Sequence, residues 1–188
     1  MTPDPKGELL LMVTREERFN RLHERHFEAI RRYAFRRSPT LADDIVSETF
    51  LVAWRRIDEV PDDERPWLFG VARNVRLNLQ RSSLRQRAVA DRLIGETRSS
   101  ASNEPDRSGD AISDALSVLS ERDREILLLQ AWEGLNRSEI AAVLSCSVAN
   151  VSVRLHRARE RFADALAADP RGSQSLSPLI SGGASDVV

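Results

Sequence analysis

The chain has 188 residues, of which 41% are hydrophobic and 30% are charged, a composition typical of a folded protein with enough apolar side chains for a core. The formal net charge of -1 does not by itself indicate a nucleic-acid-binding protein. Cys146 is the only cysteine, which excludes a disulfide or a cysteine-based metal site within one chain. No apolar run approaches the roughly 20 residues of a membrane span, and residues 1–7 do not resemble a signal peptide. We therefore expect a soluble, cytoplasmic protein that makes no membrane contact.

The charges are strongly segregated along the chain. Lys6 is the only lysine, and seven arginines lie within residues 65–92 against a single acid. Four more arginines lie within residues 148–163, whereas acidic residues gather at 43–48 and 58–64. This segregation predicts faces of opposite sign that meet different partners.

Helical spacing of apolar residues dominates the first half of the chain, and strand signals are weak. After a flexible N-terminus (residues 1–14), we expect helices over about residues 15–36, 41–57 and 66–93, with an acidic, proline-containing loop between the second and third. These helices form a domain that spans residues 15–93.

A change in composition marks a boundary. Residues 94–110 are rich in Ser, Asn, Pro and Gly, which predicts a flexible linker. A second domain over residues 111–168 follows, with helices expected at 111–119, 121–132, 138–144 and 148–167, and residues 169–188 read as a disordered tail. The fold class is all-α, with two small helical domains joined by a flexible linker.

The clearest local pattern is a short helix, a three-residue turn and a longer basic helix over residues 137–161. This is the anatomy of a helix-turn-helix. Ser120, Asn136 and Ser147 are placed to cap the helices that follow them, and Ser145 stands where such turns often need a positive φ. An αα-hairpin with solvated arginines would explain the helices, but it leaves the basic face of the last helix without a purpose.

A basic last helix suits the DNA major groove, where Asn and Arg can hydrogen-bond base edges and an apolar side chain can meet a thymine methyl group. Arginines on the flanks are better placed for phosphates. The predicted DNA-binding residues of this helix are Asn150, Ser152, Val153, Arg154, His156, Arg157, Arg159 and Arg161.

Residues 133–144 and 151–161 resemble the C-terminal domain of the extracytoplasmic-function (group 4) sigma factors of bacterial RNA polymerase. Residues 43–55 resemble the core-polymerase-binding helix of that family, and residues 66–74 resemble its promoter −10 helix. The resemblance covers about residues 17–166, with the motifs in the order of the family.

The resemblance implies a role for each of these helices, and the last helix, with its predicted DNA-binding residues, would read the promoter −35 element. The second helix would dock on the clamp helices of the largest polymerase subunit through Asp44, Glu48, Leu51 and Arg55, and the flap of the second-largest subunit is a further expected contact. The third helix and residues 58–65 before it would hold the −10 element and an extruded base. The expected −10 residues are Arg65, Trp67, Arg73, Asn74, Asn78, Arg81 and Arg85.

Some details depart from the family pattern or stay open. Ser152 and Val153 stand where many relatives have a basic residue followed by Ser, so the base preference of the last helix is not fixed by the resemblance. Trp67 could stack on a base, although packing in the core is the interpretation that we favour.

The resemblance implies a promoter-specificity factor without catalytic residues, cofactor or metal, with core polymerase and promoter DNA as partners and an anti-sigma protein as a possible further one. A stand-alone helix-turn-helix regulator is the alternative, but it leaves the first-domain motifs unexplained. An enzyme built on His23, His26 and Glu48 has no supporting motif.

Overall fold

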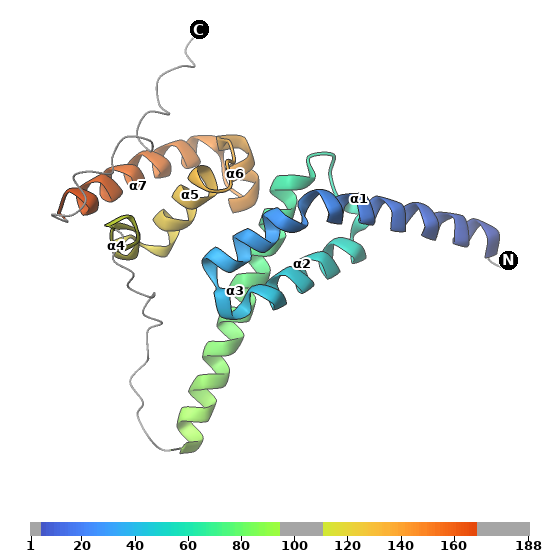
Figure 1. Cartoon of the computed structure of the whole chain (residues 1–188), viewed down its shortest axis with the longest axis horizontal. Helices are drawn as coiled ribbons and strands as arrows, with labels where there is room; N and C mark the ends of the chain where they lie inside the picture. The colour runs from blue at the N-terminus through green and yellow to red at the C-terminus, as the bar shows by residue number, and fades with distance from the viewer. Residues whose placement is uncertain (1–4, 95–110, 169–188) are drawn as a thin grey trace, which may run out of the picture. The chain divides into compact units, whose positions relative to one another are not determined.

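The computed structural model describes residues 5–94 and 111–168, with side chains from Thr14 to Gln86 and from Ala111 to Ala168 (Figure 1). All regular secondary structure in these ranges is helical, which confirms the all-α prediction. The described helices form two units, α1–α3 and α4–α7. The predicted tail and all of the predicted linker except residue 94 lie outside the described residues.

The first unit consists of α1 (Pro5–Arg37), α2 (Ala42–Arg55) and α3 (Glu64–Ile94), with short 3-10 turns at Pro39–Leu41 and Ile57–Glu59. Each helix contributes one apolar stripe to a shared core, as the helical spacing predicts. Figure 1 shows the second half of α3 running on beyond α1 and α2. The fully or almost fully buried side chains include Leu22, Ile30, Tyr33, Ile45, Phe50, Ala53, Leu68, Phe69 and Ala72.

The start of α1 differs from the prediction. The helix begins at Pro5 rather than near Arg15, so residues 5–14, expected within a flexible N-terminus, are helical. Proline is well suited to the first helical position, where its missing N–H leaves no hydrogen bond unmade. The leucine-rich residues 9–12 are strong helix formers, so local propensity continues the helix toward the N-terminus.

Histidines in α1 occupy two different environments. The His23 ring lies 4.9 Å from the Phe27 ring and 4.6 Å from the Phe50 ring, between centroids. Its neighbour His26 contacts Glu64 at the start of α3, with Nε2 3.0 Å from Oε2. Both histidines therefore contact other side chains of the helical bundle, whereas Glu48 lies exposed on α2.

Two hydrogen bonds between polar side chains join α3 to the turn between α1 and α2. Arg76 is only 4% exposed, and its Nη1 donates to Gln80 Oε1 at 3.1 Å. Gln80 Nε2 in turn donates to Ser38 Oγ at 3.2 Å. Because Ser38 is also buried, these hydrogen bonds attach the α1–α2 turn to α3.

The second unit consists of α4 (Ala111–Val118), α5 (Glu121–Ala131), α6 (Arg137–Leu144) and α7 (Val148–Ala168). Across the turn between them, α6 and α7 are bent by 101°, an angle typical of a helix-turn-helix. Ile140 of α6 and Val151 and Leu155 of α7 are buried. The predicted motif is therefore confirmed.

Local capping explains where these helices begin. Asp123 N donates to Ser120 Oγ, and Asn150 N donates to Ser147 Oγ, both at 3.2 Å. Asn136 and Glu139 form a reciprocal capping box, with N···O distances of 3.0 and 2.7 Å. Ser145 has a φ of 52°, the left-handed conformation expected for this turn, which a side chain adopts less readily than glycine.

Arg124 holds the end of α4 in a way that the sequence did not indicate. Its Nε donates to Leu116 O at 2.8 Å, and its Nη2 donates to Ser117 O at 3.0 Å and to Leu119 O at 3.3 Å. A helix C-terminus leaves carbonyl groups without partners, and a cation there is favourable. One guanidinium therefore attaches α5 to the last turn of α4.

We predict that Arg124→Ala loosens α4, because its terminal carbonyls lose a charged donor that contributes roughly 1 to 3 kcal/mol. Amide hydrogen exchange of residues 111–118 in the full chain should become faster. Arg122→Ala is the matched control, since Arg122 is exposed on the same helix. Equal exchange in the two variants would contradict the assigned role of Arg124.

Candidate nucleic-acid and protein interfaces

The outer face of α7 carries most of the predicted DNA-binding residues. Asn150, Val153, His156 and Arg157 are exposed, whereas Val151, Leu155 and Ala158 are buried on the opposite side. Ser152 is half-buried, and its Oγ donates to Val148 O at 3.1 Å. The exposed side chains form a continuous strip over the first three turns of the helix, the part that a recognition helix presents to base edges.

Two of the predicted residues are held by α5 instead of standing free. Arg159 Nη2 donates to Gln130 Oε1 at 2.8 Å. Arg161 Nη1 donates to Asp123 Oδ2, and Asp123 is only 8% exposed. Both arginines therefore fasten α7 to α5, whereas the described residues provide no hydrogen bond or ion pair for Arg157.

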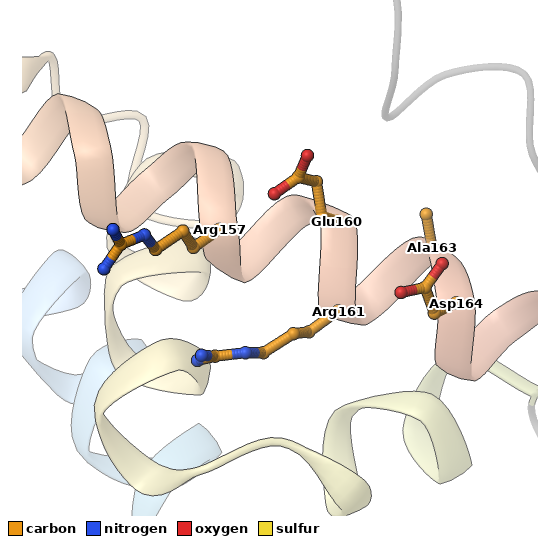
Figure 2. Close-up of a pocket in the computed structure, with 5 residues that line it drawn as sticks. All are labelled: Arg157, Glu160, Arg161, Ala163 and Asp164. Carbon is orange, nitrogen blue, oxygen red and sulfur yellow. The ribbon is translucent and has the colours of Figure 1, made fainter.

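Figure 2 shows Arg157 and Arg161 among the residues that line a pocket on α7. Arg157 and Arg161, one turn apart, line an open pocket together with Glu160, Ala163 and Asp164. His156 also lies beside an acid, with Nε2 3.4 Å from Glu160 Oε1. Carboxylates therefore border the exposed strip from Glu160 onward. The charge of α7 favours a phosphate at its N-terminal half.

The predicted −10 residues divide into two groups along α3. Asn74, Asn78, Arg81 and Arg85 are exposed at spacings of four, three and four residues, on one face of the helix. Arg81 Nη1 donates to Asn78 Oδ1 at 3.3 Å. Amides and guanidinium groups in such a row can bind base edges and phosphates together.

The other three lie within the first ten residues of α3 and are half-buried: Arg65, Trp67 and Arg73. The Arg65 guanidinium carbon lies 5.9 Å from the centroid of the Phe69 ring, and the Arg56 guanidinium carbon lies 5.8 Å from that of Trp67. Trp67 thus keeps part of its surface in solvent while one face meets a cation.

Basic side chains of α1 hold the acidic loop before α3. Arg18 Nη2 donates to Val60 O at 2.7 Å, and Arg15 Nη1 lies 3.1 Å from Asp58 Oδ2. Arg25 Nη1 and His26 Nε2 approach the same Glu64 oxygen at 2.9 and 3.0 Å. Sequence reasoning missed these contacts, although basic residues in one helix and acids in one loop were the available signal.

The four predicted polymerase-binding residues share the exposed face of α2. Asp44, Glu48, Leu51 and Arg55 are all exposed, and Leu51 is 37% exposed. Ile45, Thr49 and Phe50 are buried on the other side. A row of charges with one apolar side chain suits a charge-matched protein interface.

Other kinds of site have little support. Among the described residues, no group of three or more His, Cys, Asp or Glu side chains could hold a metal ion. No single helix in the described ranges is long and apolar enough to cross a membrane. The bent pair α6–α7 passes that test on length and composition alone, as helices in the core of soluble proteins also do.

Comparison with known proteins identifies the family. Residues 22–87 match the family described as Sigma-70 region 2, and residues 109–162 match the family described as Sigma-70, region 4. The chain is 35% identical over 150 residues to the ECF RNA polymerase sigma factor SigL of Mycobacterium tuberculosis, covering 73% of this chain and 82% of SigL. The chain is an extracytoplasmic-function sigma factor. Such a sigma factor is a non-enzymatic protein that directs promoter-specific initiation of transcription.

Further relatives support the same assignment of this sigma factor. CnrH of Cupriavidus metallidurans is 32% identical over 171 residues, covering 80% of this chain and 87% of CnrH. The structure of CnrH with the cytosolic domain of CnrY superposes with a TM-score of 0.56 at 31% identity, covering 80% of this chain and 88% of that one. RpoE from Bartonella quintana, solved with the anti-sigma factor NepR, gives a TM-score of 0.62 at 26% identity, covering 80% and 98%.

We predict that Arg161→Ala destabilises the second unit of the sigma factor by roughly 1 kcal/mol, because it leaves the carboxylate of Asp123 without its ion-pair partner at a partly exposed site. Arg157→Ala should leave stability unchanged, because Arg157 stands free one turn earlier. Urea unfolding of the two full-length variants measures the difference. Equal midpoints would show that the Arg161–Asp123 pair does not brace α7.

Proposed function

We propose that this sigma factor binds core RNA polymerase through α2 and reads two promoter elements, the −10 element with α3 and the −35 element with α7. The observation that carries the proposal is the exposure of three separate polar faces, each opposite a buried stripe. Work of this kind requires no cofactor and no catalytic residue, and it takes place in the cytoplasm, where the polymerase and the chromosome are.

The polymerase contact uses the outer face of α2, with Asp44, Glu48 and Arg55 around Leu51. Exposed charges steer association and select the partner, whereas a central apolar side chain supplies desolvated contact area. We assign this face to the clamp helices of the largest subunit. The second unit meets the flap of the second-largest subunit, so that the polymerase sets the separation of the two DNA-reading helices.

The −10 contact combines two kinds of interaction. Arg81 and Arg85 attract phosphates, while Asn74 and Asn78 hydrogen-bond the edges of unpaired bases. Arg65, Trp67 and Arg73 line the approach to this row, next to the loop that receives an extruded base. Binding the base there offsets part of the stacking free energy lost when it leaves the duplex.

The −35 contact rests on the exposed strip of α7. Asn150, Ser152, Val153 and His156 face the base edges, and Arg154 and Arg157 bind phosphates on the flanks. Arg159 and Arg161 keep a long-range attraction for DNA through their charge, but their main contribution is to hold α7 on α5. The two DNA contacts gain strength when one polymerase holds both units on the same promoter.

Two points separate this proposal from a stand-alone regulator. A regulator binds its operator tightly as a free protein, whereas this sigma factor should bind promoters well only together with core polymerase. Its relatives also suggest control by a protein partner, because the RpoE and CnrH structures contain NepR and CnrY. We extend this to the present chain and propose that an anti-sigma protein holds it inactive.

We predict that charge reversal at Arg157 and at Arg81 separates the two promoter contacts. Arg157→Glu should weaken holoenzyme binding to the −35 duplex by about ten- to a hundredfold, because a phosphate-binding cation becomes an anion. Arg81→Glu should leave −35 binding intact and reduce the fraction of opened promoter. Gel-shift and permanganate assays, on a promoter mapped by transcript sequencing after overexpression, measure the two steps.

Arg122→Glu is the control for these reversals, since it changes the same charge at an exposed position of α5 outside the predicted interfaces. Wild-type behaviour of both Arg157→Glu and Arg81→Glu would refute the assignment of α7 and α3. A loss of all binding with Arg122→Glu would show that net charge alone explains the effects.

A further inference from the structure

We propose that α1 is a brace for the −10 contact: Arg18, with Arg25 and His26, fixes the loop of residues 56–63 in the conformation that receives the promoter base. The three are positioning residues that act through the loop and need not touch DNA. The inference rests on the proposed role of α3 and this loop in reading the −10 element.

Side chains distant in sequence hold the loop at two points, at Val60 in its middle and at Glu64, where it joins α3. Arg18, 42 residues before Val60, donates a part-buried hydrogen bond of 2.7 Å to the Val60 carbonyl. At the start of α3, Arg25 and His26 contact Glu64, whose side chain is 16% exposed. A main-chain carbonyl bound by a guanidinium cannot move without breaking a charge-assisted hydrogen bond, so α1 restricts the loop directly.

The inside of the loop is anchored as well. Ile57 is fully buried and Val60 is 4% exposed. Arg56 donates to Glu59 Oε2 from Nε at 2.8 Å and from Nη2 at 2.6 Å. The remaining residues, Pro61, Asp62 and Asp63, form an exposed tip. The exposed tip, residues 61–63, therefore lies between the contacts at Val60 and at Glu64.

This arrangement has an energetic consequence for promoter opening. Taking a base out of the stack is unfavourable, and ordering a flexible loop around it would add a further entropic cost. A loop that is ordered before DNA arrives avoids that cost, so that more of the contact free energy favours the open promoter.

The brace also changes the charge that the DNA meets. The loop and the start of α3 carry five acids: Asp58, Glu59, Asp62, Asp63 and Glu64. Arg15, Arg56 and Arg25 form ion pairs with Asp58, Glu59 and Glu64, respectively, and His26 also contacts Glu64. Only the tip carboxylates lack such a partner among the described residues, and a carboxylate at that point can accept a hydrogen bond from an exocyclic amino group of a base.

The test compares Arg18→Ala with two other variants, Arg18→Lys and Arg31→Ala. Arg18→Lys keeps one cationic donor and should restore most of the function. Arg31→Ala is the matched control, because Arg31 lies on the same helix and pairs with its neighbour Glu28, where both side chains are more than half exposed. Amide exchange of residues 57–63 should become faster in Arg18→Ala and stay unchanged in Arg31→Ala.

The functional readout is the affinity of the holoenzyme for a single-stranded oligonucleotide that carries the non-template −10 region of a mapped promoter. Arg18→Ala should weaken this binding by about tenfold, which corresponds to roughly 1.4 kcal/mol. Affinity for core polymerase and for a −35 duplex should stay at the wild-type value. A general loss of folding would lower all three affinities together.

Faster exchange in the loop with unchanged oligonucleotide binding overturns the brace while leaving the proposed function intact. Failure of the wild-type holoenzyme to bind the oligonucleotide overturns both. Should Arg18→Ala not fold, Glu64→Gln replaces it, because it removes the anion that Arg25 and His26 share without creating a cavity. Wild-type oligonucleotide binding by folded Glu64→Gln would equally overturn the brace.

Discussion

Burial of a single apolar stripe on each helix is the constraint from which the interfaces of this sigma factor follow. In α2, the buried positions of Ile45, Thr49 and Phe50 leave Glu48 and Leu51 facing outward. The same geometry leaves the asparagines and arginines of α3, and the first turns of α7, in solvent. Rotating any of these helices would bury charged groups without partners, at a cost of several kcal/mol each. The core therefore determines which side chains each partner can meet.

Arginine serves two distinct purposes in this molecule. Some guanidinium groups bind within the protein: Arg18 and Arg124 donate to main-chain carbonyls, and Arg161 pairs with a nearly buried aspartate. Others, such as Arg85 and Arg157, stand in solvent on the faces assigned to DNA. The planar guanidinium with several donors suits both purposes, because it can satisfy two or three acceptors at once and keeps its charge at every physiological pH. A count of arginines along the chain cannot separate these purposes.

Local sequence patterns predicted most of the helices and their caps. Contacts between residues far apart in the sequence were not predicted. The caps at Ser120, Asn136 and Ser147 and the positive φ of Ser145 depend on residues within a few positions, so the sequence was sufficient for them. The start of α1 was placed too late, because helix propensity in residues 9–12 continued it to Pro5. The exposed side of each site helix followed from its spacing. The Arg18–Val60 and Arg161–Asp123 contacts join residues 42 and 38 positions apart, and no local pattern identifies such partners.

We propose that this sigma factor acts only together with core RNA polymerase, through its exposed faces on α2, α3 and α7. Run-off transcription with purified core polymerase and a mapped promoter tests it most directly, in reactions with and without the purified chain. We expect a discrete transcript only when both proteins are present, and its loss when the charges of Asp44 and Glu48 are reversed. Tight promoter binding by the chain alone, combined with no transcript in the presence of core polymerase, would contradict it.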